Sequence, residues 1–386
     1  MDLKALDQAY IAGTYKRFPV EIVAGKGSIV TDTDGKQYID LGSGIGVTAF
    51  GIADDVWQQA IIDQIGKVQH MSNLYYTAPC AQLAEMLCKR TGMQKVFFSN
   101  SGAEANECAI KAARKYAAEQ HGADCFTIAT LQNSFHGRTL TTLAATGQEQ
   151  FHKLFQPLTP GFVHVPANDI DAFKAVAAET KLAALMLECV QGEGGVLPLD
   201  PAYVQAAAAF CKENGILLIA DEVQTGNGRT GTLYAYEQFG IQPDLVATAK
   251  GLGGGLPLGA TLFAESTAQV FGPGDHGSTF GGNPVSCAAA LSILARIDEK
   301  LLADVKRKGD MVRESLEGAP GVKGVSGLGL MLGVETEKPA AEVVTACMAQ
   351  GVLCLTAKQK VRLLPALNIP EDVLMRAIDV LKAACA

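Results

Sequence analysis

Short apolar runs alternate with amphipathic stretches through the middle of the chain. Residues 95–99 (KVFFS) form the first such run, and the apolar positions of residues 103–120 recur at helical spacing. That spacing places small residues on one face of the predicted helix: Ala105, Cys108, Ala109, Ala112 and Ala113. The run and the stretch together predict a strand followed by a helix.

The same alternation continues to about residue 264. Further strands are predicted at 126–130, 162–166, 182–188, 216–222, 244–250 and 259–264. A helix is predicted over 169–180, and another begins at Asp200-Pro201 and ends before Gly215. Continuously apolar strands separated by helices are typical of a mostly parallel sheet with helices on both faces. The predicted fold class is therefore α/β.

The two ends of the chain predict a second, smaller α/β domain. Strands at 330–335, 352–357 and 361–365 alternate with helices at 340–350 and 371–386. Residues 28–44 predict a β-hairpin that turns at Asp34-Gly35, which we expect to join this domain. One long helix over 285–317 is expected to connect the two parts. The expected division is a large domain of residues 51–299 and a small domain of residues 1–50 with 300–386.

Composition and charge exclude several classes of protein. The chain has 386 residues, and 48% hydrophobic content is too high for a disordered protein. A net charge of −8 without a basic run argues against a nucleic-acid partner or an anionic membrane. The apolar runs are far shorter than the roughly 20 residues of a membrane span, and the first residues lack a signal-peptide pattern. The 10 cysteines form no C-x-x-C pair, so we expect buried thiols in a reducing cytoplasm.

A different polar group follows each of several predicted strands. In chain order these groups are Ser101-Gly102-Ala103, then Phe135, His136 and Arg138, then Gln191 and Glu193, then Asp221 and Gln224, and finally Lys250. Ligands of open α/β sheets bind beyond the carboxyl ends of the strands. We therefore expect these groups to line one site.

Each group also has a purely structural interpretation. Ser101-Gly102-Ala103 could hold a phosphate at a helix N-terminus or be an ordinary N-cap. Lys250 could be a desolvated nucleophile or a surface lysine at a strand end. Asp221 ends an apolar strand and needs a cation, either Arg229 or the protonated ring nitrogen of a cofactor. Phe135 could be a core residue or a surface on which a ring stacks.

Taken together, the groups match the needs of pyridoxal phosphate. The phosphate requires an anion site, the ring a flat neighbour, the ring nitrogen a carboxylate, and the aldehyde a lysine. Arg138 and Arg362 could be surface residues, or they could bind substrate carboxylates in bidentate fashion.

Several segments resemble the class III aminotransferases. They are NSGAEANE (100–107), SFHGRT (134–139), QGEGG (191–195), ADEVQTGNGRTG (220–231), ATAKGLGGGLPLGA (247–260) and HGSTFGGNP (276–284). The resemblance covers nearly the whole chain and is strongest to the acetylornithine aminotransferases of arginine biosynthesis. It implies the type I fold of enzymes that depend on pyridoxal 5'-phosphate, whose large domain carries a seven-stranded, mostly parallel sheet. It implies no metal.

The resemblance also implies roles in cofactor binding. Lys250 would hold the cofactor covalently and afterwards move the substrate proton. Asp221 would pair with the pyridine nitrogen, Gln224 would bond the ring hydroxyl, and Phe135 would stack on the ring. The residues that would hold the phosphate are Ser101, Gly102 and Ala103, with Thr279 reaching it from the neighbouring subunit of a homodimer.

The substrate residues follow from the same resemblance. Arg138 would bind the α-carboxylate of the amino donor, and Arg362 that of glutamate or 2-oxoglutarate. Glu193 would pair with Arg362 while a terminal-amine donor is bound. Tyr15 and Ser278 are further candidates for the substrate site. The implied reaction moves the terminal amino group of N-acetylornithine to 2-oxoglutarate.

Other functions remain open on the sequence. Within the family they are ornithine, succinylornithine, succinyldiaminopimelate and 4-aminobutyrate aminotransferases and a class III racemase. A dinucleotide-binding oxidoreductase is disfavoured because no G-x-G-x-x-G follows the early strands. An inactive binding protein is disfavoured because Lys250, Asp221 and Arg138 are all present. The chain departs from the family by lacking Gly-His-x-His-Pro after residues 51–57 and by having Glu188-Cys189 in place of Glu-Pro.

Overall fold

A seven-stranded sheet forms the centre of the structure, a computed structural model that describes residues 2–386. In spatial order its strands are β4 (Lys95–Ser99), β12 (Gly259–Phe263), β11 (Leu245–Thr248), β10 (Leu217–Asp221), β7 (Leu182–Leu187), β5 (Thr127–Leu131) and β6 (Phe162–Val165). Only β12 runs antiparallel to its neighbours. The predicted α/β class with a mostly parallel sheet is confirmed.

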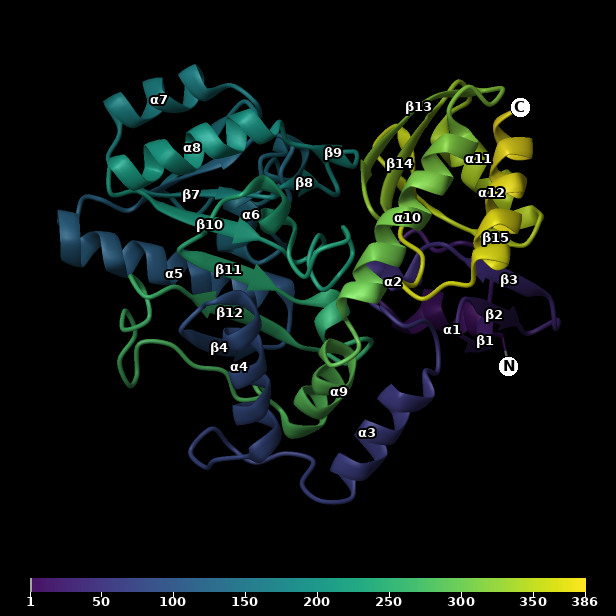
Figure 1. Cartoon of the computed structure of the whole chain (residues 1–386), viewed down its shortest axis with the longest axis horizontal. Coiled ribbons are helices and arrows are strands. Elements are labelled where there is room, and N and C mark those ends of the chain that lie inside the picture. Colours follow the sequence, from purple (N-terminus) through teal and green to yellow (C-terminus); the bar gives the residue numbers. More distant parts are fainter. Residues whose placement is uncertain (1) are drawn as a thin grey trace.

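Helices cover both faces of this sheet (Figure 1). On one face lies α5 (Gly102–His121), and on the other lie α7 (Ile170–Glu179) and α8 (Pro201–Glu213). Side chains of β7 alternate between the two faces, so that Met186 packs with α5 and Leu187 with α8. The small residues predicted on one face of α5 are all buried, which brings the helix close to the sheet.

Two four-stranded sheets make up the smaller lobe (Figure 1). The first contains β1 (Ile22–Lys26), β2 (Ile29–Asp32), β3 (Gln37–Asp40) and β15 (Val352–Leu353). The second contains β13 (Val322–Leu328), β14 (Met331–Thr336), β17 (Lys360–Leu363) and β16 (Leu355–Ala357). The predicted hairpin is confirmed as β2 and β3, and Gly35 takes the positive φ of 80° that the turn requires. Two predicted helices are also present, α11 (Ala340–Ala349) and α12 (Glu371–Cys385).

The prediction of one long helix over 285–317 is wrong. The segment forms two helices, α9 (Pro284–Leu294) and α10 (Glu299–Leu316). The Asp298 carboxylate accepts a hydrogen bond from the Leu301 N–H, which begins a new helix at that point. The chain turns between the two helices, and α10 leads from the larger lobe to the smaller one (Figure 1).

The predicted strand at 352–357 is divided between the two small sheets. β15 pairs parallel with β3, whereas β16 pairs antiparallel with β17. Cys354 lies between them and is buried. Strand β13 was not predicted, because its glycine-rich sequence lacks a strand pattern.

The remaining elements are short or lie outside the predicted ones. They are α1 (Leu3–Tyr10), α2 (Ser43–Gly46), α3 (Asp55–Ile65), α4 (Ala78–Thr91), α6 (Leu140–Ala145), β8 (Val190–Gln191), β9 (Leu197–Pro198) and the 3-10 turns η1 (Glu149–Phe151), η2 (Ala235–Phe239) and η3 (Lys250–Leu252).

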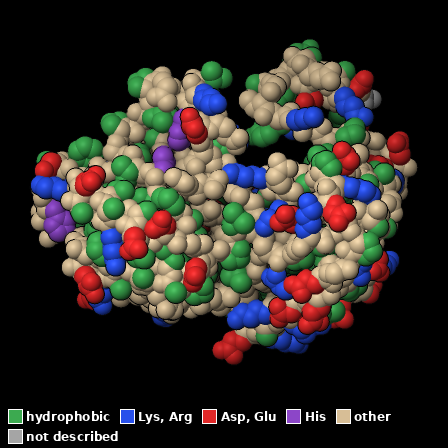
Figure 2. Space-filling view, turned by 90° about the horizontal axis from the view of Figure 1, so that it is seen from above, with side chains coloured by type: hydrophobic (Ala, Val, Ile, Leu, Met, Phe, Trp, Pro, Cys, Tyr) green, Lys and Arg blue, Asp and Glu red, His purple; other side chains and the backbone are tan. Residues whose placement is uncertain are grey.

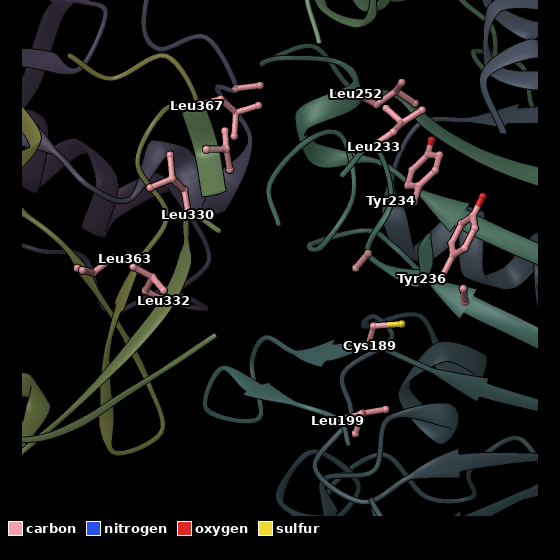
Figure 3. Close-up of a cluster of buried hydrophobic side chains, with 14 of the residues drawn as sticks. Cys189, Leu199, Leu233, Tyr234, Tyr236, Leu252, Leu330, Leu332, Leu363 and Leu367 are labelled. Atoms are coloured by element: carbon pink, nitrogen blue, oxygen red, sulfur yellow. The ribbon is translucent and has the colours of Figure 1, made fainter. Parts of the chain in front are cut away.

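One apolar cluster continues from the larger lobe into the smaller one. Figure 3 shows Tyr234 and Leu252 from the larger lobe, with Leu332 of β14 and Leu363 of β17, as members of this cluster. Seen from above, the surface is hollowed between the lobes (Figure 2). All strands of the large sheet come from residues 95–263, so we propose domains of 51–299 and of 1–50 with 300–386.

Candidate active site

A cavity of about 440 Å³ lies at the carboxyl ends of the parallel strands. Its walls include these predicted site residues: Ser101, Gly102, Ala103, Phe135, Arg138, Asp221, Gln224 and Lys250. They come from segments that are far apart in the sequence, and the topology of the sheet brings their strand ends together.

The N-terminus of α5 opens onto this cavity. The Ser101 hydroxyl accepts a hydrogen bond from the Glu104 N–H at 3.2 Å, so this serine is an N-cap. A Cβ atom at Gly102 would come within 2.5 Å of a Val223 methyl group, so a larger residue here would force Val223 or the start of the helix to move. The N–H groups of Gly102 and Ala103 remain at the positive end of a long helix, which suits an anion.

Asp221 ends β10 and is only 3% exposed. Its Oδ2 accepts a hydrogen bond from the Asn106 Nδ2 at 2.8 Å and lies 2.7 Å from the His136 Nδ1. Its Oδ1 accepts from the Val223 N–H at 3.0 Å. These contacts hold the carboxylate in one orientation at the wall of the cavity.

The structural alternative for Asp221, an ion pair with Arg229, is wrong. The Arg229 guanidinium donates to the carbonyl oxygens of Leu330 and Pro365 in the smaller lobe. Burial lowers the pKa of Arg229 to about 10. This arginine therefore ties the two lobes together and leaves the cavity side of Asp221 open.

Lys250 follows β11 in the short turn η3. Its φ is +44°, a left-handed conformation that is strained for a residue with a side chain. Burial lowers its pKa, while the charges of Glu193 and Asp221 oppose that shift and the charge of Arg362 adds to it. The side chain is thus a partly desolvated amine in the cavity wall.

Phe135 and Arg138 lie on the loop after β5. Phe135 is half-buried and meets Phe151 edge-on, with ring centroids 6.0 Å apart. The exposed Arg138 places its guanidinium 4.6 Å from the Phe151 ring and 5.6 Å from the Phe135 ring. Within residues 2–386 no carboxylate forms an ion pair with Arg138, so its charge faces the cavity mouth without a partner.

Arg362 on β17 of the smaller lobe and Glu193 lie outside the cavity wall and are joined to it through Gln224. The Arg362 Nη1 donates to the Glu193 Oε1 at 2.5 Å and to the Gln224 Oε1 at 3.1 Å, and Arg362 is only 3% exposed. The Gln224 Nε2 in turn donates to the Glu193 Oε1 at 3.3 Å. Burial favours a raised pKa for Glu193, but the charge and hydrogen bond of Arg362 lower it below its ordinary value.

Other predicted residues lie outside the cavity wall. The Ser278 hydroxyl accepts hydrogen bonds from the Asn100 Nδ2 and the Gly281 N–H, so it lies just behind the wall. Thr279 is exposed to solvent. Tyr15 is 73% exposed and has the Arg17 guanidinium over its ring.

Sequence reasoning missed part of this site. It noted His136 without giving it a role, and it assigned nothing to Asn106 or to the buried Glu188. Asn106 was detectable, because it interrupts the small apolar face of α5 and a buried amide needs partners. Within residues 2–386 no group of His, Cys, Asp and Glu side chains is arranged to hold a metal. Over the same residues no helix is both long and apolar enough to cross a membrane.

The sequence pattern of the family described as aminotransferase class-III matches residues 10–385. The chain belongs to the class III aminotransferases. It is therefore a transaminase that depends on pyridoxal 5'-phosphate and acts on amino acids and oxo acids.

Individual class III aminotransferases are similar to this chain over nearly their whole length. An acetylornithine aminotransferase of Haemophilus ducreyi is 54% identical over 381 residues, which are 98% of this chain and 97% of that protein. One of Aquifex aeolicus is 45% identical over 376 residues, covering 97% of this chain and 99% of the relative.

Solved structures give the same fold. The ornithine aminotransferase of Toxoplasma gondii superposes with a TM-score of 0.94 at 31% identity, over 99% of this chain and 93% of that one. The N-acetylornithine aminotransferase of Stenotrophomonas maltophilia superposes with a TM-score of 0.86 at 34% identity, over 99% and 98%. The predicted type I fold is confirmed.

The residues of this class III aminotransferase fit the cofactor. His136 has a buried Nε2 without a hydrogen-bond partner in the part of the chain that the structure describes, on the wall of the same cavity. The Asp221 carboxylate, the Lys250 amine and the free N–H groups of α5 are complementary to the ring nitrogen, the aldehyde and the phosphate, respectively.

Proposed function

We propose that this chain moves the terminal amino group of N-acetylornithine to 2-oxoglutarate in arginine biosynthesis. The products would be N-acetylglutamate 5-semialdehyde and glutamate. High identity to acetylornithine aminotransferases supports the proposal. The structural observation that carries it is the contrast between two arginines. Arg138 is exposed and has no ion-pair partner within residues 2–386, whereas Arg362 is buried and neutralised by Glu193.

This contrast favours a donor whose reacting amine is far from its carboxylate. Such a donor can leave its carboxylate on Arg138 while its terminal amine lies deep in the cavity beside Lys250. With Glu193 on Arg362, the inner arginine does not attract the same carboxylate. The acceptor 2-oxoglutarate carries two carboxylates, so Glu193 must release Arg362 before the second half-reaction.

The chain's own residues then carry the proton transfer. When bound, pyridoxal 5'-phosphate supplies an aldehyde and a ring that accepts electrons. The Lys250 Nζ holds the cofactor and, once released, moves a proton from the substrate carbon that bears the amino group. Asp221, oriented by Asn106 and His136, presents a negative charge to the protonated ring nitrogen. Phe135 supplies a flat wall for the ring.

We extend the proposal to a homodimer with shared sites in the cytoplasm. Large apolar side chains are exposed near Thr279, namely Met71, Leu74, Tyr75, Tyr76 and Phe280. Asn73 joins their two segments by donating to the carbonyl oxygens of Ser278 and Gly281. Burial of this face by a second copy would remove apolar surface from water and carry Thr279 to the partner's phosphate site.

All 10 cysteines are free thiols, which supports a reducing compartment.

Half-reaction kinetics test the proposed function. We expect N-acetylornithine to have a higher kcat/KM than ornithine, N-succinylornithine, N-succinyldiaminopimelate or 4-aminobutyrate. The variant Glu193→Ala should lose preference for N-acetylornithine over glutamate by roughly tenfold, because Arg362 then attracts carboxylates at all times. Glu213→Ala, exposed at the end of α8, is the control. A preference for free ornithine would mean that ornithine, not N-acetylornithine, is the amino donor. An unchanged preference in Glu193→Ala would refute the proposal that Glu193 controls access to Arg362.

A further inference from the structure

A buried carboxylate beside the cavity has no role in the reaction described above. Glu188 directly follows β7, is 4% exposed and lines the cavity. Its hydrogen-bond partners are main-chain N–H groups rather than a cationic side chain. Within residues 2–386 this carboxylate forms no salt bridge, so the main-chain hydrogen bonds must offset the cost of burying it.

The two oxygens of Glu188 hold two different loops. Oε1 accepts from the Phe135 N–H at 2.9 Å, and Oε2 accepts from the Gly192 N–H at 3.1 Å. The first loop carries Phe135 and Arg138, and the second carries Glu193. A single carboxylate therefore fixes the spacing between the loop that carries Phe135 and Arg138 and the loop that carries Glu193.

The loop that carries Glu193 is also restricted by close packing against Gln224. A side chain at Gly192 would come within 2.4 Å of the Gln224 Oε1, so the loop passes directly against Gln224. Gln224 itself bonds both Glu193 and Arg362. A shift of Gly192 would therefore move Gln224 and, with it, the Glu193–Arg362 pair.

The surroundings of Glu188 shift its pKa in opposing directions, and the net shift shows that its ionised form is costly to bury. Burial raises the pKa of Glu188 to about 7, His136 acts to lower it, and Asp221 acts to raise it. The two main-chain N–H groups also stabilise the ionised form. The ionised form accepts from both N–H groups through charge-assisted bonds, which are stronger than bonds to a neutral carboxyl.

We propose that Glu188 is a positioning residue that sets the distance between the Arg138 loop and the Glu193 loop, and through it the balance between terminal-amine donors and oxo-acid acceptors. The role in substrate balance rests on the proposed function. The role in loop spacing rests on the geometry alone.

The main test uses Glu188→Gln. Glutamine has one acceptor oxygen, so one of the two N–H groups loses its partner. In the protein without cofactor, we expect amide hydrogen exchange to become roughly tenfold faster in peptides from 132–139 and 188–196. In the full enzyme, kcat/KM for N-acetylornithine should fall more than that for 2-oxoglutarate, because the loosened Glu193 covers Arg362 less. Glu188→Asp, which keeps the charge but is one methylene shorter, should show the same pattern and serves if the glutamine variant does not fold.

Glu222→Gln is the matched control. Glu222 is 1% exposed, burial raises its pKa to about 7, and it accepts from the N–H groups of Ala235 and Tyr236. Neither of those two residues lines the cavity. This variant should exchange faster around 222–236 and keep the ratio of the two half-reactions.

The outcomes separate the two claims. Unchanged exchange in both loops of Glu188→Gln and Glu188→Asp would overturn the spacing role. An equal shift of the half-reaction ratio in Glu188→Gln and Glu222→Gln would overturn the role in substrate balance. A wild-type chain without activity toward any donor would instead overturn the proposed function, and the exchange of the cofactor-free protein would still decide the spacing role.

Discussion

Burial shifts the pKa values of individual side chains in the cavity away from their ordinary values. Lys250 is the clearest case, because burial favours its neutral form while the nearby carboxylates of Glu193 and Asp221 favour the charged one. The net direction is a lowered pKa. The neutral amine, which is the nucleophile, is therefore present at lower pH than in an exposed lysine.

This direction predicts the pH dependence of amine reactivity. In the protein without cofactor, we expect half-maximal reductive methylation of Lys250 at a pH below 10.5, the ordinary value for lysine. The variant Asp221→Asn removes a negative charge that favours the ammonium form, so its midpoint should move to still lower pH. Peptide mass spectrometry after labelling at several pH values measures both midpoints. A midpoint at or above the ordinary lysine value would contradict the burial argument.

Residue identity was more readily predicted than residue pairing. Lys250, Asp221 and Arg138 could be singled out because each follows a strand, and strand ends meet at one edge of a parallel sheet. The pairing of Asp221 with Asn106 and His136 could not be predicted, because these residues reach it from a helix and a loop that are distant in sequence. Hydrogen bonds between side chains depend on tertiary distances that local patterns do not encode.

Local patterns mislead at the connection between the lobes and in the smaller lobe. No glycine or proline separates α9 from α10, and aspartate and glutamate suit both a helix surface and a helix start, so the sequence does not reveal the new start at Asp298. The glycine-rich segment from Gly321 to Gly333 had no predicted role. In the structure it forms the β13–β14 hairpin, and Gly327 and Gly329 take positive φ values of 114° and 53° there. Gly329 also lies directly against Gly309, where α10 packs on this hairpin.

Close packing of α10 against this hairpin predicts the effect of Gly309→Ala. A methyl group at Gly309 would lie 2.2 Å from the Gly329 carbonyl oxygen, and backbone cannot move aside easily. Alanine gains about 1 kcal/mol of helix propensity, whereas overpacking costs about 1–3 kcal/mol, so we expect a net loss of stability. Thermal unfolding of the cofactor-free protein measures the loss as a lower midpoint.

The control for this substitution is Gly324→Ala on β13. Nothing lies within 4 Å of the position that a methyl group would take there, and its φ is not in the left-handed region. The control should unfold at the wild-type temperature or above it. A Gly309→Ala protein as stable as the control would mean that the helix can move away from the hairpin at little cost.

At the scale of the whole molecule, the site is divided between parts of the chain that pack on one another. Lys250 and Asp221 come from the large sheet, whereas Arg362 comes from β17 of the smaller lobe. The continuous apolar cluster and the Arg229 bonds to Leu330 and Pro365 fix these parts in register. Only Thr279 among the predicted phosphate ligands is exposed away from the cavity wall, and the apolar residues around it are exposed as well.

Mixed dimers test whether Thr279 serves the partner's site. In a dimer of one Lys250→Ala chain and one Thr279→Ala chain, shared sites predict one dead site and one site with both wild-type residues. That second site combines Lys250 of one chain with Thr279 of the other, so it should bind pyridoxal phosphate and turn over like one wild-type site. Homodimers of Thr279→Ala should bind the cofactor more weakly at both sites, because a phosphate hydrogen bond is lost. Differently tagged chains, co-expressed and purified through both tags, supply the mixed dimer for cofactor titration and kinetics. If Thr279 instead served its own chain, the surviving Lys250 site would lack the threonine and would bind cofactor as weakly as the Thr279→Ala homodimer.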